Sequence, residues 1–442
     1  MIQLDKKETN DHLYLEVYRY YRDLIKNGKM LPGSKMPSLR KCSQELKLSR
    51  TTIESAYLQL AADGYILAKA QSGYYVTEIS VHQRQKASSQ YSQSVNVRFD
   101  FSSAGVDRES FRFDLWSRYI KSALRQDQRM LTYGEVQGEQ DLRQVLADYI
   151  RQRRNIQCSP DDIVVGASVQ CLLQVLCPLL KSRYHSVSFP NPSFVQGSTI
   201  FQDFGFQLHY RDKNSQVIYV SPAHMTKWGE IMPVSRRLEL LEYASQRESL
   251  IIEDDYENEF VYLQKPTPSL FGLSGGQNVV YIGSFSRLLL PSIRISFMVL
   301  PPSLLDAYRK KADFYNQTAS KAEQIALCQF IRDGHLASQT RKLKRLYAQK
   351  GKQLCQVLST VFGKEYSIKM GPAGTSLALT LPCGVSTDVV RKETEKKGLR
   401  ISVLSETADT KTFLLSYSAM EVQDFLPACH ILKETLQSLS VS

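Results

Sequence analysis

The chain has 442 residues, more than one compact core usually holds, so we expect two or more domains. Hydrophobic residues make up 43% and charged residues 23%, as in globular proteins, and the formal net charge of +12 favours an anionic partner such as nucleic acid without establishing one. No apolar run reaches the roughly 18 residues of a membrane span, and the charged first residues lack a signal-peptide core, so a soluble, cytoplasmic protein is expected.

The first 79 residues have the pattern of a small helical unit that ends in a hairpin. Apolar residues at helical spacing, and then two short tyrosine-containing runs, predict three helices and two strands at residues 12–27, 38–46, 49–63, 65–67 and 74–76. Ser38 and Ser49 stand at the N-cap positions of the second and third helices, and Gly64 ends the third. Three helices followed by a hairpin are the winged form of the helix-turn-helix.

The start of the third helix would enter the major groove of DNA, where its first residues would reach bases and phosphates. Arg50 can donate to a guanine edge or a phosphate, and short hydroxyl side chains suit phosphate oxygens. Arg40 would face the DNA backbone, and Gly73 at the hairpin tip would permit close approach to the minor groove. The predicted DNA-binding residues are Ser38, Arg40, Ser49, Arg50, Thr51, Thr52 and Gly73. Taken alone, Ser-Arg-Thr-Thr could equally be a capped, solvated helix start.

Residues 80–97 are rich in Ser, Gln, His and Lys without periodicity, which predicts a linker. Beyond residue 98, short apolar runs alternate with helical patterns and predict buried parallel strands with crossover helices at 162–165, 187–189, 217–220, 250–252 and 279–282. We expect an α/β domain over 98–442, with a large subdomain at about 131–320 and a smaller α+β subdomain at about 325–442. The 8 cysteines lack Cys-x-x-Cys spacing, so reduced, mostly buried thiols and no metal site are expected.

The order of these features resembles two known families. From Leu13 to Gly73 the chain resembles the GntR winged-helix family, and residues 98–442 resemble fold-type-I aminotransferases, so the whole chain looks like the MocR type of GntR regulator. The markers of the second resemblance are Tyr133-Gly134-Glu135-Val136-Gln137-Gly138, Ser221-Pro222-Ala223-His224, Glu253-Asp254-Asp255-Tyr256, Gly283-Ser284-Phe285-Ser286-Arg287 and the following Arg294.

The resemblance implies a site for pyridoxal phosphate (PLP). Such a site needs a lysine for the Schiff base, a carboxylate for the pyridinium nitrogen, an aromatic ring that stacks on the pyridine, and donors for the phosphate. By resemblance, Asp254 is the pyridinium partner, Tyr256 the phenol near the ring hydroxyl, and Phe194 the stacking ring. The residues implied to contact a cofactor are Tyr133, Ser168, Phe194, His224, Asp254, Tyr256, Ser284, Ser286, Arg287 and Arg294.

Several positions depart from the family pattern. The lysine position is Arg287, and an arginine stays protonated and forms no stable imine. Val169 stands where a phosphate-binding hydroxyl is usual, although Ser168 could partly compensate. Met225 replaces a glutamine, and Leu414 stands where an arginine would take a substrate carboxylate.

Three interpretations remain open for the second domain. It is a non-catalytic module that senses an unknown small ligand and forms a homodimer, or it binds PLP without a covalent bond, or it is an active aminotransferase. We predict the first, with no catalytic residues, because the missing lysine is the one group that the chemistry cannot spare. The partners expected are then double-stranded operator DNA, a second copy of the chain and an unidentified small effector.

Overall fold

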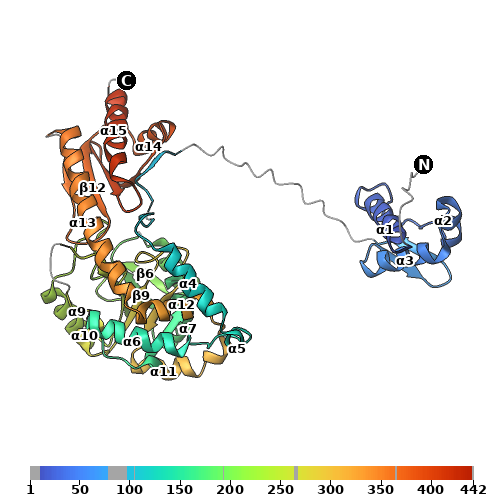
Figure 1. Cartoon of the computed structure of the whole chain (residues 1–442), viewed down its shortest axis with the longest axis horizontal. Helices are drawn as coiled ribbons and strands as arrows, with labels where there is room; N and C mark the ends of the chain where they lie inside the picture. Colours follow the sequence, from blue (N-terminus) through green and yellow to red (C-terminus); the bar gives the residue numbers. More distant parts are fainter. Residues whose placement is uncertain are drawn as a thin grey trace. The chain divides into compact units, whose positions relative to one another are not determined.

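The chain divides into two compact units, Met1–Ser94 and Val95–Ser442 (Figure 1). The computed structural model describes residues 10–77, 97–103, 105–192, 194–262, 267–363 and 366–440. The linker expected at 80–97 lies outside these residues, apart from its last position. Within the described ranges, no helix is long and apolar enough to cross a membrane, and no cluster of His, Cys, Asp or Glu could hold a metal ion.

The N-terminal unit is a winged helix, as the sequence predicts. Its elements are α1 (Asn10–Lys26), α2 (Leu39–Leu46), α3 (Arg50–Ala62), β1 (Ile66–Lys69) and β2 (Gly73–Val76). Ser38 Oγ accepts a hydrogen bond from Lys41 N at 3.2 Å, and Ser49 Oγ accepts one from Thr52 N at 3.1 Å, so both predicted N-caps are confirmed.

The core of this unit is built around Tyr57 of α3, which is fully buried. Its ring packs edge-on against Tyr21 of α1 and Tyr74 of β2, which ties the hairpin to the helices. Lys69 pairs with Gly73 in the antiparallel ladder, so the hairpin tip comprises residues 70–72. Gly73 is therefore the first residue of β2 and not the tip itself, which corrects the sequence prediction by one position.

The second unit is centred on a seven-stranded sheet in the order β4-β10-β9-β8-β7-β5-β6. Its strands are β4 (Ile163–Gly166), β5 (Ser186–Phe189), β6 (Gln207–Tyr210), β7 (Val217–Val220), β8 (Leu250–Asp254), β9 (Val279–Ser284) and β10 (Ser296–Val299). The five expected strands are present, but β10, which the sequence analysis missed, lies between β4 and β9 and runs antiparallel to both. The sheet is therefore mixed and not wholly parallel.

Successive residues of these strands point to opposite faces, and each face has its own buried cluster of side chains. Ile163, Val165 and Ile251 belong to one cluster, whereas Val164 and Ile252 belong to the other. The surrounding helices are α4 (Phe113–Leu124), α5 (Asp127–Met130), α6 (Gln140–Arg154), α7 (Val169–Leu180), α8 (Val195–Asp203), α9 (Val234–Gln246), α10 (Leu270–Ser274), α11 (Pro302–Arg309) and α12 (Lys321–Arg332). Both faces of the sheet are thus covered, as its continuous apolar strands require.

The C-terminal part forms a smaller α+β subdomain. In Figure 1 the long helix α13 runs from the large subdomain into this smaller one. Its antiparallel sheet has the order β11-β12-β15-β14. The elements are α13 (His335–Phe362), β11 (Ser367–Lys369), β12 (Ser376–Pro382), α14 (Thr387–Lys396), β13 (Leu399–Arg400), β14 (Ser402–Glu406), β15 (Thr410–Ser416) and α15 (Phe425–Ser440). The short strand β3 (Phe99–Asp100), which precedes the large subdomain in the chain, pairs in parallel with β13 of this smaller one.

Candidate DNA-binding surface and candidate ligand site

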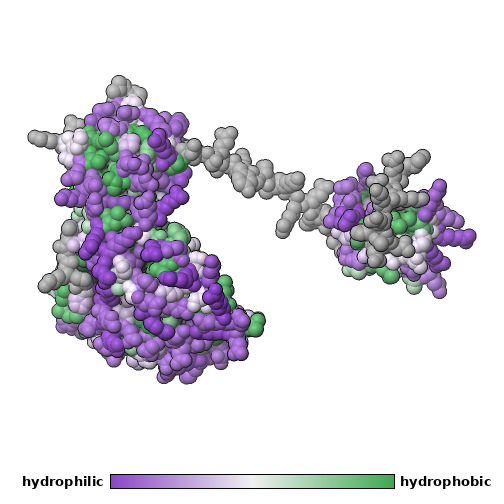
Figure 2. Space-filling model, viewed as in Figure 1, coloured by the Kyte–Doolittle hydropathy of each residue, from purple (hydrophilic) through white to green (hydrophobic). Residues whose placement is uncertain are grey.

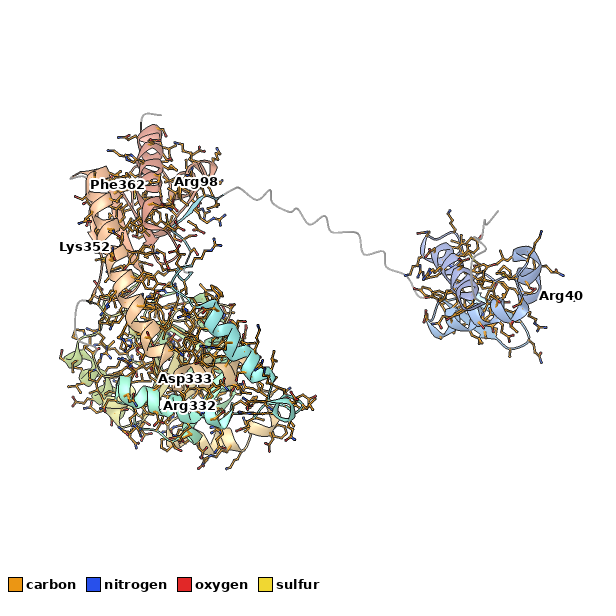
Figure 3. All side chains as sticks on the ribbon, in the orientation of Figure 1. Arg40, Arg98, Arg332, Asp333, Lys352 and Phe362 are labelled. Atoms are coloured by element: carbon orange, nitrogen blue, oxygen red, sulfur yellow. The ribbon has the colours of Figure 1, made fainter. Side chains whose placement is uncertain are left out.

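The first turn of α3 presents two polar side chains at the surface of the N-terminal unit. Arg50 and Thr51 are both exposed and directly follow the N-cap. Arg40 of α2 is exposed as well and is drawn at the rim of the unit in Figure 3. Thr52 is buried instead, and its Oγ1 lies 2.7 Å from Ser49 Oγ. Thr52 therefore completes the helix cap, while Arg40, Arg50 and Thr51 are the donors that face solvent.

The hairpin carries a second basic group, which the sequence analysis missed. Lys35 pairs with Tyr75 of β2 in an isolated bridge, and the Nζ atoms of Lys69 and Lys35 lie 4.7 Å and 5.7 Å from the centre of the Tyr75 ring. Both lysines are exposed. Cation–π contacts of this kind hold the two positive charges on one side of the hairpin. No linear signal marks this pair, because the two lysines lie far apart in the chain.

In the second unit, three parallel strands end at one edge of the sheet and bring the candidate ligand-binding residues together. Asp254 is the last residue of β8, Ser284 is the last residue of β9, and His224 follows β7 by four positions. Because β7, β8 and β9 run in the same direction, their carboxyl ends meet at the same edge.

Asp254 is buried, and only one of its carboxylate oxygens has a partner. Tyr219 of β7 donates a hydrogen bond to Asp254 Oδ2 at 2.6 Å, whereas Oδ1 has no hydrogen-bond partner among the described residues. Burial raises the pKa of the Asp254 carboxyl to about 6, and the bond from Tyr219 opposes that rise. The Phe194 ring lies 5.3 Å from the Tyr219 ring, so Phe194 belongs to the same wall of the site.

The neighbouring Asp255 has a different role. Arg154 of α6 donates two hydrogen bonds to its carboxylate, at 2.6 Å and 2.8 Å, and the Tyr281 hydroxyl donates a third at 2.7 Å. Both ions of this pair are buried, which stabilises the fold only because the carboxylate is so fully bonded. Asp255 therefore anchors the end of β8, and Asp254 is the carboxylate left to face a ligand.

Arg287 lies in the turn after β9 and pairs with a buried carboxylate that the sequence analysis did not single out. Arg287 Nε is 3.1 Å from Glu257 Oε1, and His224 Nδ1 is 3.3 Å from Glu257 Oε2. Burial lowers the pKa of His224, the Glu257 charge opposes this effect, and Arg287 lowers it further. The His224 ring also lies 4.9 Å from the Tyr256 ring. His224, Tyr256, Glu257 and Arg287 thus form one contiguous group.

Serine hydroxyls gather beside this group through the register of the sheet. Ser296 of β10 pairs with both Gly166 of β4 and Ser284 of β9, and Ser296 Oγ lies 3.1 Å from Ser284 Oγ. Ser286 Oγ is 3.4 Å from Ser284 Oγ. Ser168, two residues after Gly166, caps α7, whose N-terminus carries partial positive charge. Hydroxyls next to a helix N-terminus are suited to a phosphate or another anion.

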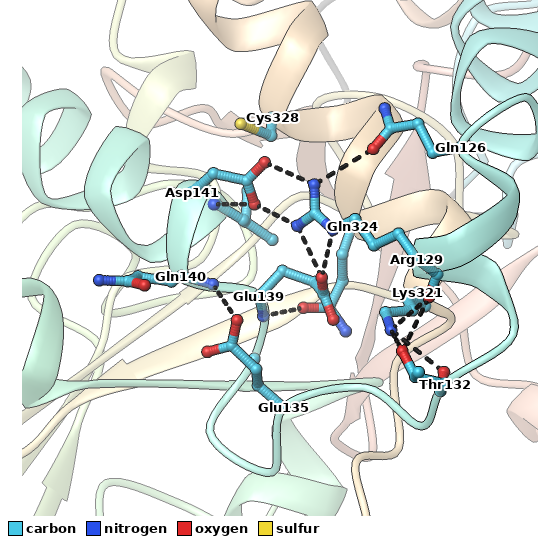
Figure 4. Close-up of polar contacts among 12 residues, drawn as sticks. Gln126, Arg129, Thr132, Glu135, Glu139, Gln140, Asp141, Lys321, Gln324 and Cys328 are labelled. Atoms are coloured by element: carbon cyan, nitrogen blue, oxygen red, sulfur yellow. Dashed lines mark hydrogen bonds and ion pairs between the residues drawn. The ribbon is translucent and has the colours of Figure 1, made fainter.

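Two implied cofactor residues lie apart from these contacts. The Arg294 side chain is exposed and donates to the Pro291 carbonyl at 3.4 Å. Tyr133 is fully exposed, and its backbone is held by Lys321, whose Nζ donates to the carbonyl oxygens of Arg129, Thr132 and Tyr133 at 2.6–3.1 Å. Figure 4 shows how this network continues from Arg129 to Glu139 and Asp141.

The site fits PLP in part. An orphaned oxygen on buried Asp254 suits the ring N–H of a pyridinium, Phe194 offers an aromatic face, and the serines with the start of α7 suit a phosphate. When bound to an enzyme through a lysine, PLP acts as an electron sink for amino-acid chemistry. Lys227, an amine three residues after His224 in the chain, has an exposed side chain. The residues therefore fit the ring and the phosphate, and the covalent bond is what Arg287 cannot supply.

The small subdomain closes one side of the site through glycines. A Cβ on Gly374 would lie 2.6 Å from His224 Cε1, and a Cβ on Gly229 would lie 1.6 Å from the carbonyl oxygen of Ala373. The loops 225–232 and 371–374 are also joined by backbone hydrogen bonds, including Gly371 N to Trp228 O at 2.6 Å. The loop after β11 is therefore in direct contact with a residue that lines the site.

Comparisons with known proteins agree with both halves of this structure. The gntR family of bacterial regulatory proteins matches residues 13–76, and the aminotransferase class I and II family matches residues 107–392. The chain is 31% identical to the uncharacterized HTH-type transcriptional regulator YdeL of Bacillus subtilis, over 93% of this chain and 94% of that protein. It is 25% identical to the probable rhizopine catabolism regulatory protein MocR of Rhizobium meliloti, over 92% of this chain and 89% of that protein.

A solved structure shows the shared fold of the second unit. The crystal structure of an archaeal alanine:glyoxylate aminotransferase matches with a TM-score of 0.69 at 19% sequence identity, over 77% of this chain and 91% of that one. One assignment follows from the two family matches, from the similarity to these relatives over nearly the whole chain, and from the two observed folds. The chain belongs to the MocR type of the GntR family, the HTH-type transcriptional regulators that join a GntR winged helix to a region of the class I and II aminotransferase family.

Proposed function

We propose that the aminotransferase-like region of this regulator binds a small ligand without a covalent bond and does not transaminate. The observation that carries the proposal is Arg287, which occupies the position of the Schiff-base lysine by family motif and is ion-paired with buried Glu257. A guanidinium offers no neutral amine at working pH. The pair also anchors the arginine, because removing one partner would leave an uncompensated charge in a buried place.

We further propose that the N-terminal unit binds an operator in the cytoplasm through the exposed start of α3. Arg50 would contact a base or phosphate, and Thr51, Arg40 and the cap residues Ser38 and Ser49 would position the helix on the backbone. Lys35 and Lys69 on the hairpin would add phosphate contacts. Thr52 supports this surface from inside, through the cap.

A homodimer is part of the proposal. Leu131 and Tyr133 are almost wholly exposed, yet hydrogen bonds from Lys321 hold the backbone of their turn in place. Large apolar side chains exposed on a fixed turn are typical of a protein–protein contact surface. Figure 2 shows a hydrophobic spot on the surface at the α5 end of the large subdomain, one of several on this face. Two copies would present two winged helices to two half-sites in DNA.

The variant Arg287→Lys tests the non-catalytic assignment. With added PLP, this variant should turn yellow, and borohydride reduction should leave a pyridoxyl group on residue 287 that mass spectrometry of peptides can locate. The wild-type protein should show neither, because no amine is present at this position. Arg294→Lys is the matched control, since it adds a lysine on the exposed neighbour and should trap nothing. A pyridoxyl group trapped on one specific lysine of the wild type, Lys227 for example, would show that the proposal is wrong.

A further inference from the structure

Two buried carboxylate oxygens in the ligand site have no hydrogen-bond donor among the described residues. They are Asp254 Oδ1 and Glu257 Oε1, on side chains of residues that are 6% and 4% exposed. Glu257 Oε1 is close to Arg287 Nε, but the contact is an ion pair without the geometry of a hydrogen bond. A buried acceptor without a donor costs free energy, on the order of 1–3 kcal/mol. Two such atoms in one site indicate that a ligand supplies the donors.

The identity of the missing donors follows from where these carboxylates lie. Asp254 ends β8 beside the aromatic wall of Tyr219 and Phe194, so a flat ring with an N–H suits its free oxygen. Glu257 lies next to Arg287, the position at which an aminotransferase would hold the 4′ carbon of its cofactor through lysine. His224 on the other side of Glu257 is buried with a lowered pKa and brings no positive charge at neutral pH.

We propose that the site selects a phosphorylated pyridine that carries an amine, of the class of pyridoxamine 5′-phosphate, over the corresponding aldehyde, PLP. The inference rests on the non-covalent ligand site proposed above. An aldehyde oxygen can only accept a hydrogen bond, so PLP offers Glu257 nothing, and Arg287 removes the covalent bond that would otherwise favour the aldehyde. An ammonium group donates to the Glu257 carboxylate in a charge-assisted hydrogen bond, and the ring N–H donates to Asp254.

Glu257 is thus a specificity-determining residue, and its role differs from that of Asp254. Asp254 would contact the ring shared by the amine, alcohol and aldehyde forms, so it contributes to the affinity for all three. Glu257 would contact only the substituent in which they differ. The alcohol, pyridoxine 5′-phosphate, is a neutral donor and should fall between the other two.

Isothermal titration calorimetry of the full-length protein with these three compounds tests the proposal. The wild type should bind pyridoxamine 5′-phosphate about tenfold or more tightly than PLP, since a charge-assisted hydrogen bond contributes that much or more. Glu257→Gln should lose most of the advantage of the amine over the alcohol, because the amide oxygen accepts a hydrogen bond from either group without a negative charge. Arg287→Lys should reverse the order, so that PLP binds best. Asp254→Asn should weaken all three. Circular dichroism and melting curves verify that each variant is folded.

The outcomes separate this inference from the proposal on which it rests. Equal binding of amine and aldehyde by the wild type, or tighter binding of the aldehyde without a trapped lysine, would overturn the selectivity while leaving a non-covalent site in place. Binding of none of the three compounds by the wild type would overturn the ligand class. The wild-type comparison alone is decisive if a variant fails to fold. Inorganic phosphate serves as the competitor that shows whether the phosphate end alone explains the binding.

Discussion

Arginine and lysine carry the same charge at neutral pH, but only lysine can lose its proton to become a neutral amine that forms an imine. In the turn after β9, Arg287 keeps a positive charge near Glu257 and His224, so the electrostatics of the site are preserved. What changes is the reactivity, because the guanidinium has no accessible neutral form. Under the proposed non-covalent function, this single residue would separate a site that binds its ligand from a site that transforms it.

At the DNA-binding surface, Arg50→Ala should weaken binding to the operator by about 1–3 kcal/mol, which is the range for an arginine–guanine contact. Arg50 is exposed and makes no contact that the helix needs, so the melting temperature should stay unchanged. Gel shifts with and without competitor DNA measure the effect. Arg118→Ala, which removes one exposed charge from the other unit, is the control. Equal operator affinity of Arg50→Ala and wild type would exclude Arg50 from the reading surface.

The raised pKa of the buried Asp254 carboxyl predicts how the stability of the fold depends on pH. Burial raises this pKa from 3.8 to about 6, so between roughly pH 4 and pH 6 the folded protein holds a proton that the unfolded chain has lost. The contribution of Asp254 to stability is therefore largest at low pH and is lost as the pH rises through about 6. Its size is on the order of 3 kcal/mol.

Thermal unfolding of the ligand-free protein between pH 4.5 and 7.5 measures this contribution. We expect Asp254→Asn to gain stability relative to the wild type as the pH rises across this range, because the amide never ionises. Asp409→Asn changes an exposed carboxylate and should run parallel to the wild type. Parallel curves for Asp254→Asn and wild type would show that the carboxyl titrates alike in the folded and unfolded states.

At the scale of elements, the loops 225–232 and 371–374 interlock through positions that only glycine can occupy. Gly229 has φ of 90°, and a Cβ there would lie 1.6 Å from the Ala373 carbonyl oxygen. Gly229→Ala must therefore push the loops apart, and we expect a loss of about 2–4 kcal/mol in unfolding free energy. Denaturant unfolding measures it. Gly384→Ala, where a Cβ would meet nothing within 4 Å, should cost little. Similar unfolding curves for the two variants would contradict the interlock.

Most elements could be predicted from the sequence, and those that could not had weak patterns for identifiable reasons. The strands β5, β7, β8 and β9 are short apolar runs between turns, which is a strong signal. β6 is an edge strand with exposed, polar residues, so it lacks that signal. β10 lies in the stretch from Ile295 to Pro301, which is apolar except for Ser296, and its antiparallel direction cannot be read from composition.

Some residues of the candidate ligand site could also be predicted from the sequence, and others could not. The positions of Asp254, Ser284 and Arg287 follow from motifs along the chain, and the parallel strands bring them together. Glu257 and Tyr219 were not predicted as site residues, although both lie inside or beside the quoted motifs, because their roles depend on contacts across strands. The contact of Gly374 with His224 joins residues 150 positions apart and has no signature in a single sequence.

For the whole molecule, the two compact units predict a division of labour that fragments can test. Residues 98–442 alone should dimerise, and residues 1–79 alone should be monomeric and bind DNA weakly, because two linked winged helices gain through effective concentration. Sedimentation gives the mass of each fragment, and gel shifts compare residues 1–79 with the full chain. A monomeric 98–442 fragment, or a 1–79 fragment that binds as tightly as the full chain, would contradict this arrangement.

The parallel pair of β3 and β13 also has a mechanical consequence. The amides of Arg98 and Phe99 donate to the Gly398 carbonyl, and Phe101 bonds to Arg400 and Ser416, so residues 98–101 are bound to the small subdomain. A force that pulls on the chain from its N-terminal side would act first on the pairing of β3 with β13, and only then on the seven-stranded sheet. The same subdomain carries the loop that touches His224. If a ligand displaced that subdomain, residues 98–101, to which the linker is attached, would move with it.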